Sequence, residues 1–505
     1  MSAPENPGGP RIPGVGIRGN ALRSRIVEEI HRHGPIPFSR YMEMCLYEPG
    51  LGYYARPREQ FGKAGDFYTS SDVHAVFGRL LARQFEEMWR ALGAPKRIDL
   101  VELGPGRGLF ASDVLDWSAK QFPEFALALR YVLVEQSEHL RERLQERLAE
   151  HIAAGKAKVC DSLESAGAEA PAGHVSSLQD SGSSSTPIPS AEGAGLSSAA
   201  PPVRVSTERE PRGKPTSRPG AEASDPKAAE EQGPEGLHGP REAESSRRER
   251  HSLARHGAEG GILGDEPKDP HQSRSDGTDH IPLILFANEF FDALPVDIVD
   301  HRGSVRVAEE QGRFVEQFVP PSTEELAFID RYSVHPEPGE RVEVSLVALD
   351  WMERIATLFQ DRRGFAIFID YGYTREEQLA GCHRDTLMTY REHRASPSPY
   401  EAPGEQDITA HVNFTALRSH AAETGMNDIA LLTQTQLLLG IGEETQFGDA
   451  FQDCKLPQER AKVALQLRHL LSPEEMGEKF HVLLLANGVP DDEAHNLSAT
   501  KLLAR

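Results

Sequence analysis

Short apolar runs alternate with amphipathic stretches along much of the chain. Residues 97–103 and 130–134 are compact apolar runs with the length of a buried strand. Each is followed by a stretch with helical periodicity, at 109–122 and at 138–152. Because strands that alternate with helices are typical of βαβ units, this pattern predicts an α/β fold with a mostly parallel sheet.

The same pattern returns much later in the chain. Residues 281–288 and 365–369 predict two further buried strands. The other predicted elements are a helix that ends at the turn before Gly34, a helix over 76–85, and a mainly helical C-terminal part with a last strand at 480–485.

A long segment without aromatic residues separates these two parts. Residues 164–280 contain no Phe, Tyr, Trp, Met or Cys, and Ser, Gly, Pro, Ala, Glu and Arg dominate them. Such a composition cannot bury enough apolar surface to offset the entropy of ordering the chain, which predicts a disordered insert. A docking segment that orders on a partner is the alternative. Since strands lie on both sides, the insert interrupts one α/β domain.

The sequence pattern predicts five parts of the chain. They are a flexible N-terminus at 1–20, a helical and loop segment at 21–95, the α/β core at 96–163 and 281–400, the insert at 164–280, and a helical segment at 401–505 that completes the core.

Composition narrows the range of functions. The 505 residues are 38% hydrophobic and carry a net charge of −23, which argues against general binding to nucleic-acid phosphates. The four cysteines are far apart and form no C-x-x-C pair, so we expect free thiols and no metal site. No apolar run approaches the ~20 residues that span a bilayer, and residues 1–20 lack a signal-peptide core. We therefore expect no membrane span.

A glycine-rich loop follows the first core strand. Residues 102–108 read Glu-Leu-Gly-Pro-Gly-Arg-Gly, and Gly104, Gly106 and Gly108 would let the backbone turn tightly against a ligand at a helix N-terminus. The loop also satisfies the dinucleotide pattern G-x-G-x-x-A, so NAD stays open. Glu102 favours S-adenosylmethionine, because a carboxylate there attracts a sulfonium or amino group rather than a pyrophosphate. Glu135, after the second strand, suits the ribose hydroxyls of either cofactor.

Acidic residues follow the third strand. Ligands of open α/β sheets bind at the carboxyl ends of strands, so Asn288, Glu289 and Asp292 face the expected site. Two carboxylates beside a methyl donor suit a guanidinium acceptor, whose planar fork of donors they match. The alternative is that Asp292 caps a helix and Glu289 binds only cofactor. Farther on, Asp370 stands at a strand end, and His411 is either catalytic or a hydrogen-bonded structural histidine.

Together these stretches resemble the MidA-like methyltransferases, a family that includes the mitochondrial complex I assembly factor that methylates arginine. The motifs that carry the resemblance are 34–38, 47–54 (Tyr-Glu-Pro-Gly-Leu-Gly-Tyr-Tyr), 65–70 (Gly-Asp-Phe-Tyr-Thr-Ser), 102–108, 288–295, 370–372 and 407–414. Their order along the chain is far more specific than any one of them.

The resemblance implies a seven-stranded, Rossmann-like class I methyltransferase core with helical additions. It also implies S-adenosylmethionine as methyl donor and symmetric dimethylation of a protein arginine, on a subunit of respiratory complex I in the mitochondrial case. By matching positions, it adds to the cofactor site Gly65, Asp66, Thr69, Ser70 and Asp161.

The chain departs from the family pattern at Cys160, where Trp is frequent, at Asn413, where Asp is usual, and in the insert. The simpler location is the cytoplasm of a bacterium, and the mitochondrial matrix is the alternative. Three rival functions stay open: a small-molecule methyltransferase, a non-catalytic assembly factor that binds S-adenosylmethionine, and an NAD-dependent oxidoreductase.

Overall fold

The computed structural model describes residues 17–55, 75–167, 280–391, 394–395 and 398–504. Most of the predicted flexible N-terminus and of the predicted disordered insert lies outside these residues. At the boundaries, α1 (Ile17–His33) begins inside the predicted N-terminal segment, and α9 (Leu163–Gly167) extends into the predicted insert. None of the helices among the described residues is both long and apolar enough to cross a membrane.

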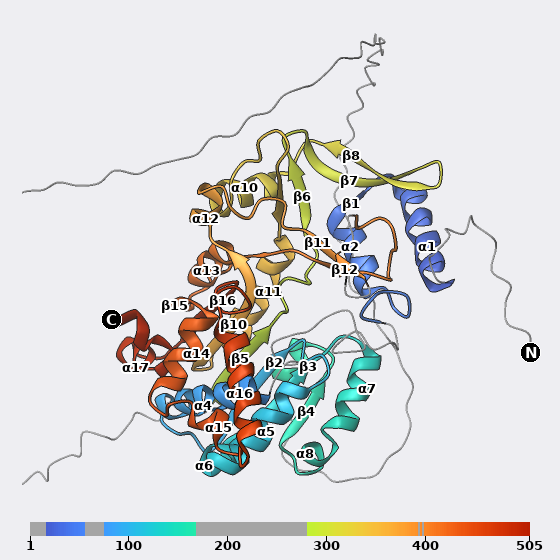
Figure 1. Cartoon of the computed structure of the whole chain (residues 1–505). Helices are drawn as coiled ribbons and strands as arrows, with labels where there is room; N and C mark the ends of the chain where they lie inside the picture. Colours follow the sequence, from blue (N-terminus) through green and yellow to red (C-terminus); the bar gives the residue numbers. More distant parts are fainter. Residues whose placement is uncertain (1–16, 56–74, 168–279, 392–393, 396–397, 505) are drawn as a thin grey trace, which may run out of the picture. The chain divides into compact units, whose positions relative to one another are not determined.

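An eight-stranded sheet forms the centre of the fold (Figure 1). Its strand order is β15-β16-β10-β5-β2-β3-β4, and β14 adds to the end of β10. The strands from β4 to β10 run parallel, whereas β16 pairs antiparallel with both β10 and β15. The bounds are β2 (Ile98–Leu103), β3 (Leu129–Val134), β4 (Ala157–Cys160), β5 (Leu283–Asn288), β10 (Gly364–Tyr373), β14 (Val412–Asn413), β15 (Asn427–Thr433) and β16 (Phe480–Asn487).

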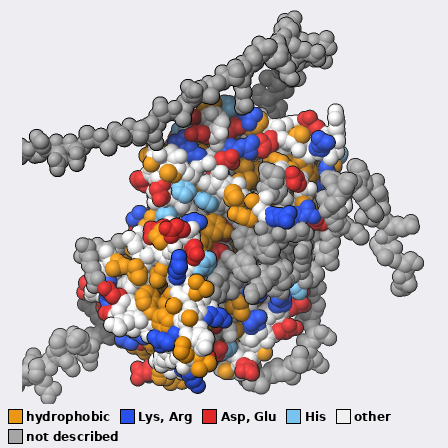
Figure 2. All heavy atoms as spheres, in the orientation of Figure 1, with side chains coloured by type: hydrophobic (Ala, Val, Ile, Leu, Met, Phe, Trp, Pro, Cys, Tyr) orange, Lys and Arg blue, Asp and Glu red, His pale blue; other side chains and the backbone are white. Residues whose placement is uncertain are grey.

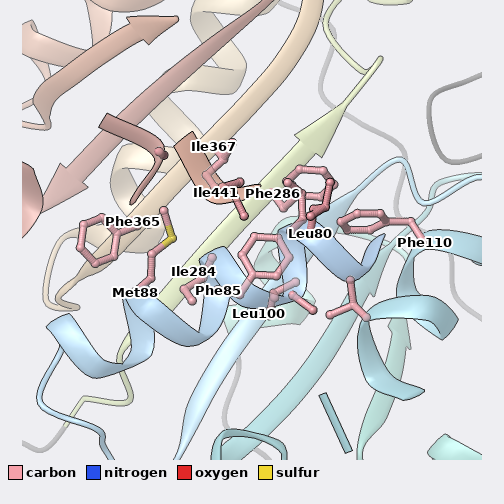
Figure 3. Packing of buried hydrophobic residues seen from close by; sticks show 14 of the residues in the cluster. Leu80, Phe85, Met88, Leu100, Phe110, Ile284, Phe286, Phe365, Ile367 and Ile441 are labelled. Carbon is pink, nitrogen blue, oxygen red and sulfur yellow. The ribbon is translucent and has the colours of Figure 1, made fainter. Parts of the chain in front are cut away.

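Helices cover both faces of this sheet, which explains why its strands are apolar runs rather than alternating patterns. On one face, Phe286 stacks on Phe110 at 4.5 Å and meets Phe85 edge-on at 5.6 Å, as Figure 3 shows. On the other face, Leu285 and Phe368 pack with α11 and α13. The first face is covered by α4 (Ala75–Ala91), α5 (Leu109–Gln121), α14 (Gln434–Glu443) and α16 (Pro457–Leu471), and the second by α9, α11 (Leu346–Phe359) and α13 (Phe414–Glu423).

Two smaller sheets, which the hydrophobic pattern did not predict, lie beyond the central one. The first is antiparallel, with the order β1-β7-β6-β9 and with β8 paired to β7. The second has the order β12-β11-β13 and leads into β14. Their strands are β1 (Ile36–Pro37), β6 (Asp297–Asp300), β7 (Gly303–Glu310), β8 (Arg313–Val319), β9 (Arg341–Val344), β11 (Met388–Arg391), β12 (Arg394–Ala395) and β13 (Asp407–Thr409). In Figure 1 the first of these sheets lies above the central sheet.

The five strands predicted for the core are present as β2, β3, β5, β10 and β16, whereas β4, β14 and β15 were not predicted. Two helical predictions also differ. The helix predicted over 138–152 is two helices, α7 (Glu138–Arg147) and α8 (Ala149–Ala153). The C-terminal segment supplies β15 to the sheet in addition to the predicted last strand, so it is less helical than predicted. The remaining helices are α2 (Phe38–Tyr47), α6 (Pro123–Ala128), α10 (Thr323–Tyr332), α12 (Arg375–Leu379), α15 (Gly448–Phe451), α17 (Asp491–His495) and the 3-10 helix η2 (Ser498–Ala504).

Candidate functional site

The glycine-rich loop joins β2 to α5 in a conformation that requires glycine. Gly104, Gly106 and Gly108 all have positive φ angles, of +62°, +51° and +70°. A Cβ at Gly104 would lie 3.1 Å from Phe290, and one at Gly108 would lie 2.6 Å from Leu144. Since side chains are excluded there by both backbone and neighbours, the loop offers bare backbone at the carboxyl edge of the sheet.

Glu102 is buried near the end of β2, two residues before Gly104. Its Oε2 accepts a hydrogen bond from the Tyr131 hydroxyl at 2.8 Å. Burial raises the pKa of the Glu102 carboxyl to about 8, although the Tyr131 hydrogen bond opposes the shift. The structure thus gives Glu102 a partner inside the protein, and its role toward a cofactor amino group stays a prediction.

Glu135 stands directly after β3, at the same edge. Its Oε1 accepts from the backbone N–H of Ser137 at 2.8 Å, and burial raises the pKa of its carboxyl to about 7. Its backbone N–H donates to the carbonyl of Cys160 at the end of β4. Asp161 follows on the surface, where its Oδ1 accepts from the Ser165 hydroxyl at 2.9 Å. Both carboxylates therefore lie along the strand ends next to the glycine loop.

Residues 288–295 form a turn that extends from β5 and contains the predicted Asn288, Glu289 and Asp292. We call it the acceptor turn, because the sequence predicts that the methyl acceptor binds there. Asp370, at the end of neighbouring β10, holds it in place: one carboxylate oxygen accepts the backbone N–H groups of Phe290, Phe291 and Asp292 at 3.2, 3.0 and 3.2 Å. Glu289 has a φ of +50°, an uncommon conformation for a residue with a side chain. Strain of this kind persists only where the surroundings enforce it, as these three hydrogen bonds do.

Asp292 is buried in this turn, and no helix begins there, so the alternative that it caps a helix is wrong. Burial raises the pKa of its carboxyl to about 6, and a hydrogen bond with Tyr371 opposes that shift. Among the described residues, its Oδ1 has no hydrogen-bond partner, and neither does the buried Oδ1 of Asn288. Burial and the negative charges of Asp292 and Glu289 raise the pKa of Asp370. Buried polar atoms without a partner inside the protein need one from outside it, such as a water molecule or a bound ligand.

Two tyrosines of the 47–54 motif tie the acceptor turn to the rest of the site. The Tyr47 hydroxyl donates to the carbonyl of Ala293 at 2.8 Å, and the Tyr54 hydroxyl donates to Asp407 at 3.0 Å. Their rings stack at 5.6 Å, and the Tyr54 carbonyl accepts from the Ser137 hydroxyl at 3.1 Å. This motif therefore connects the segment after β3 with the acceptor turn and with β13.

His411 lies just behind the acceptor turn, where its ring meets Tyr371 edge-on at 5.8 Å. Its Nδ1 is 3.3 Å from Nδ1 of His383. Burial lowers the pKa of His411 to about 4, and the nearby His383 and His481 add to the shift. His411 is thus neutral at pH 7, which favours the structural alternative, and its catalytic role stays a prediction.

Residues near the acceptor turn have partners that the sequence did not predict. Asp407 accepts from Tyr54 within β13, while Asn413, one of the departures from the family pattern, caps α13 by accepting from Ala416 N–H at 3.0 Å. Tyr371 belongs to the 370–372 motif, but its hydrogen bond with Asp292 was not predicted. The buried Glu343 carried no signal in the sequence. The predicted cofactor residues Gly65, Asp66, Thr69 and Ser70 lie outside the described residues.

These features fit S-adenosylmethionine. The glycine loop has the backbone conformation that the sequence predicts for close approach to a ligand, the carboxylate of Glu135 directly follows the neighbouring strand β3, and Asn288 has an amide oxygen without a hydrogen-bond partner among the described residues. Among the described residues, no group of three or more His, Cys, Asp or Glu side chains is arranged to hold a metal ion.

Comparisons with known proteins identify the family of the chain. A family described as "Putative S-adenosyl-L-methionine-dependent methyltransferase" matches residues 80–176 and 263–431, more than half of the chain. The mitochondrial protein arginine methyltransferase NDUFAF7 homolog of Drosophila melanogaster is 26% identical over 492 residues, which cover 94% of this chain and 86% of the relative. The Homo sapiens protein arginine methyltransferase NDUFAF7, also mitochondrial, is 25% identical over 473 residues, with 91% and 82% covered.

Solved structures share the fold. A Burkholderia thailandensis protein crystallised with S-adenosyl-homocysteine is 22% identical, with a TM-score of 0.62 and coverage of 96% of this chain and 98% of the other. A second structure from that organism, 23% identical and also with a TM-score of 0.62, covers 97% of both chains. The predicted α/β class and S-adenosylmethionine as cofactor are confirmed. The chain therefore belongs to this family of S-adenosyl-L-methionine-dependent methyltransferases.

Proposed function

We propose that this methyltransferase transfers methyl groups to a protein arginine at the acceptor turn. The observation that carries the proposal is the buried carboxylate of Asp292, whose Oδ1 is without a partner among the described residues, on a turn that also presents Glu289. A guanidinium supplies several N–H donors in a plane, which suits two neighbouring carboxylates. The curated relatives are named as protein arginine methyltransferases, which supports the same acceptor.

The cofactor supplies a methyl group on a positively charged sulfur. Gly104, Gly106 and Gly108 would hold it with backbone groups, together with Glu135 and Asn288. We also assign further residues to the cofactor site: Gly65, Asp66, Thr69, Ser70, Glu102 and Asp161.

The acceptor side must orient one guanidinium nitrogen and remove one proton for each methyl group that the nitrogen gains. Glu289 and Asp292 orient the acceptor by accepting its N–H groups. With a pKa of about 6, Asp292 can take up the released proton and return it to solvent near neutral pH. Asp370 and Tyr371 act through Asp292, because the first fixes its backbone and the second contacts its carboxylate.

On the face shown in Figure 2, acidic and basic side chains are interspersed over the described residues, so this face has no large charged patch that would select a cationic acceptor. We assign selectivity for such an acceptor to the local carboxylates. The family resemblance makes a respiratory complex I subunit the first protein to test, with symmetric dimethylation as the expected product.

We place the enzyme in the cytoplasm of a bacterium. Cys45, Cys160, Cys382 and Cys454 are all free thiols, as a reducing compartment favours. The mitochondrial matrix is the alternative, since the curated relatives carry that location in their names.

Two variants test the acceptor assignment. Glu289→Gln and Asp292→Asn should each abolish methylarginine formation, while calorimetry still detects S-adenosylmethionine binding. Mass spectrometry of cellular protein with and without the gene would identify the acceptor. Full activity in both variants would show that these carboxylates do not serve the acceptor, and a methylarginine profile unaffected by gene deletion would exclude arginine as the acceptor.

A further inference from the structure

A small cavity with a mostly apolar lining and a few polar side chains lies directly behind the acceptor turn. Its volume is about 10 Å³, close to the room that one water molecule requires. The residues that line it include Phe291 of the turn, Glu343 at β9, Ser345, Tyr373 of β10 and His411.

Two buried polar atoms at this cavity lack partners among the described residues: Oε2 of Glu343 and the hydroxyl of Tyr373. The side chains of Asn413 and Gln378 approach that hydroxyl, but neither has the geometry of a full hydrogen bond with it. Glu343 is only 3% exposed, and burial raises the pKa of its carboxyl to about 7. An ordered water needs polar partners, and the Glu343 carboxylate oxygen and the Tyr373 hydroxyl supply two at a space of this size.

The other oxygen of Glu343 begins a chain of hydrogen bonds that ends at the acceptor turn. Oε1 accepts the backbone N–H groups of Thr386 and Leu387 at 2.7 and 3.1 Å. The Thr386 hydroxyl then accepts the backbone N–H of His411 at 3.2 Å. The adjacent Ala410 donates its N–H to the carbonyl of Asp292 at 3.0 Å.

The same contact also orders β13. Leu387 immediately precedes β11, which pairs antiparallel with β13 through Met388 and Thr409 and through Tyr390 and Asp407. Glu343 therefore anchors the strand that holds Asp407 as well as the segment that contacts Asp292.

We propose that Glu343, together with one water molecule bound between its Oε2 and the Tyr373 hydroxyl, is a positioning residue that holds residues 407–413 against the acceptor turn. The inference rests on the proposed function, because it takes this turn as the place where the acceptor binds. The side-chain hydrogen bonds of Glu343 among the described residues come from Thr386 and Leu387, so its effect should be confined to the acceptor side.

Matched variants of Glu343 separate positioning from general stability. Glu343→Gln keeps an oxygen for the two N–H groups and an amide that donates to the water, so activity should stay within about threefold of wild type. In Glu343→Met the side chain has a similar length but cannot accept a hydrogen bond. The kcat/KM for the methyl acceptor should therefore fall by about tenfold or more, while the Kd for S-adenosylmethionine stays within about twofold of wild type. Amide hydrogen exchange over 407–413 should accelerate in Glu343→Met and not in Glu343→Gln.

A high-resolution crystal structure of the full chain tests the water directly. We expect one water within hydrogen-bond distance of both Glu343 Oε2 and the Tyr373 hydroxyl, and an empty cavity would overturn the proposal. An unchanged kcat/KM in Glu343→Met would also overturn it, as would a parallel loss of cofactor affinity. If Glu343→Met does not fold, Tyr373→Phe takes its place: faster exchange over 407–413 supports the proposal, and unchanged exchange contradicts it. If wild type methylates no arginine, the proposed function fails, whereas the water and the exchange rates still decide the role of Glu343.

Discussion

Gly104→Ala should weaken cofactor binding much more than it weakens the fold. Gly104 has a φ of +62°, and an L-residue pays ~1 to 2 kcal/mol for this left-handed conformation. The added Cβ would also lie 3.1 Å from the Phe290 ring. That ring has little freedom to retreat, because it packs edge-on against Trp351 at 4.9 Å and Phe291 at 5.3 Å.

The loop can relieve this strain by leaving its native conformation, and the cofactor must then restore that conformation when it binds. A penalty of ~2 kcal/mol raises the Kd by about thirtyfold, because each ~1.4 kcal/mol is a factor of ten. Isothermal titration calorimetry with S-adenosylmethionine measures this change directly.

Gly155→Ala is the matched control. Gly155 has a φ of +70°, and a Cβ there would meet no atom within 4 Å. It lies before β4, at the opposite end of the strands from the glycine loop. Both variants should lower Tm by a few degrees, and only Gly104→Ala should change the Kd. A Kd within twofold of wild type in Gly104→Ala would refute the glycine loop as the cofactor site.

Three further outcomes follow from burial and charge. Burial raises the pKa of Glu135 to about 7, so its ionised form is lost as pH falls, and the affinity for S-adenosylmethionine should drop about tenfold between about pH 8 and pH 6. Calorimetry should find a weaker dependence of this affinity on pH in Glu135→Gln. An equally steep dependence in that variant would contradict the role of Glu135. Asp99→Ala should lower the free energy of unfolding by ~3 to 5 kcal/mol in urea titrations, because buried Asp99 pairs with two arginines. Glu164→Ala breaks an exposed ion pair and should lower it by under ~1 kcal/mol. Equal losses in the two variants would contradict the expectation that the buried ion pair matters more than the exposed one. Phe286→Ala should lower the free energy of unfolding by ~3 to 5 kcal/mol in the same titrations, because Phe286 is fully buried in the packing of Figure 3. Leu127 is exposed, and Leu127→Ala should lower it by under ~0.5 kcal/mol. Similar losses in the two variants would contradict this packing.

The parallel strands β2, β3, β5 and β10 of the central sheet were predictable because they are buried on both faces. Such strands appear in a sequence as continuous apolar runs, as at 98–103 and 283–288. The glycine loop and the acceptor turn were predictable for a related reason: each is a local motif that directly follows one of these runs. The parallel edge strand β4, whose two middle side chains are only half-buried, was not predicted.

The antiparallel sheet around β7 and β8 was not predictable in the same way. β8 mixes apolar and polar residues with only one side chain fully buried, so its periodicity is weak. The two strands are joined by Gln311 and Gly312, both with positive φ, as a two-residue hairpin turn requires. Gln-Gly is not among the residue pairs that signal this turn in a sequence.

The partners of the site residues depend on contacts between distant parts of the chain. Asp370 holds backbone groups about 80 residues away, and Tyr54 reaches Asp407 across 353 positions. No periodicity encodes such contacts. The sequence could therefore indicate that Asp370 matters, but not that it organises the acceptor turn.

The most direct test of the proposed function uses S-adenosylmethionine with a deuterated methyl group. The purified full-length enzyme would be incubated with this donor and with protein extract from cells that lack its gene, and the labelled sites would be mapped by mass spectrometry. We predict deuterated methyl groups on arginine of a protein, present with wild-type enzyme and absent with Asp292→Asn. Label found only on small molecules or on other residue types would contradict arginine as the acceptor.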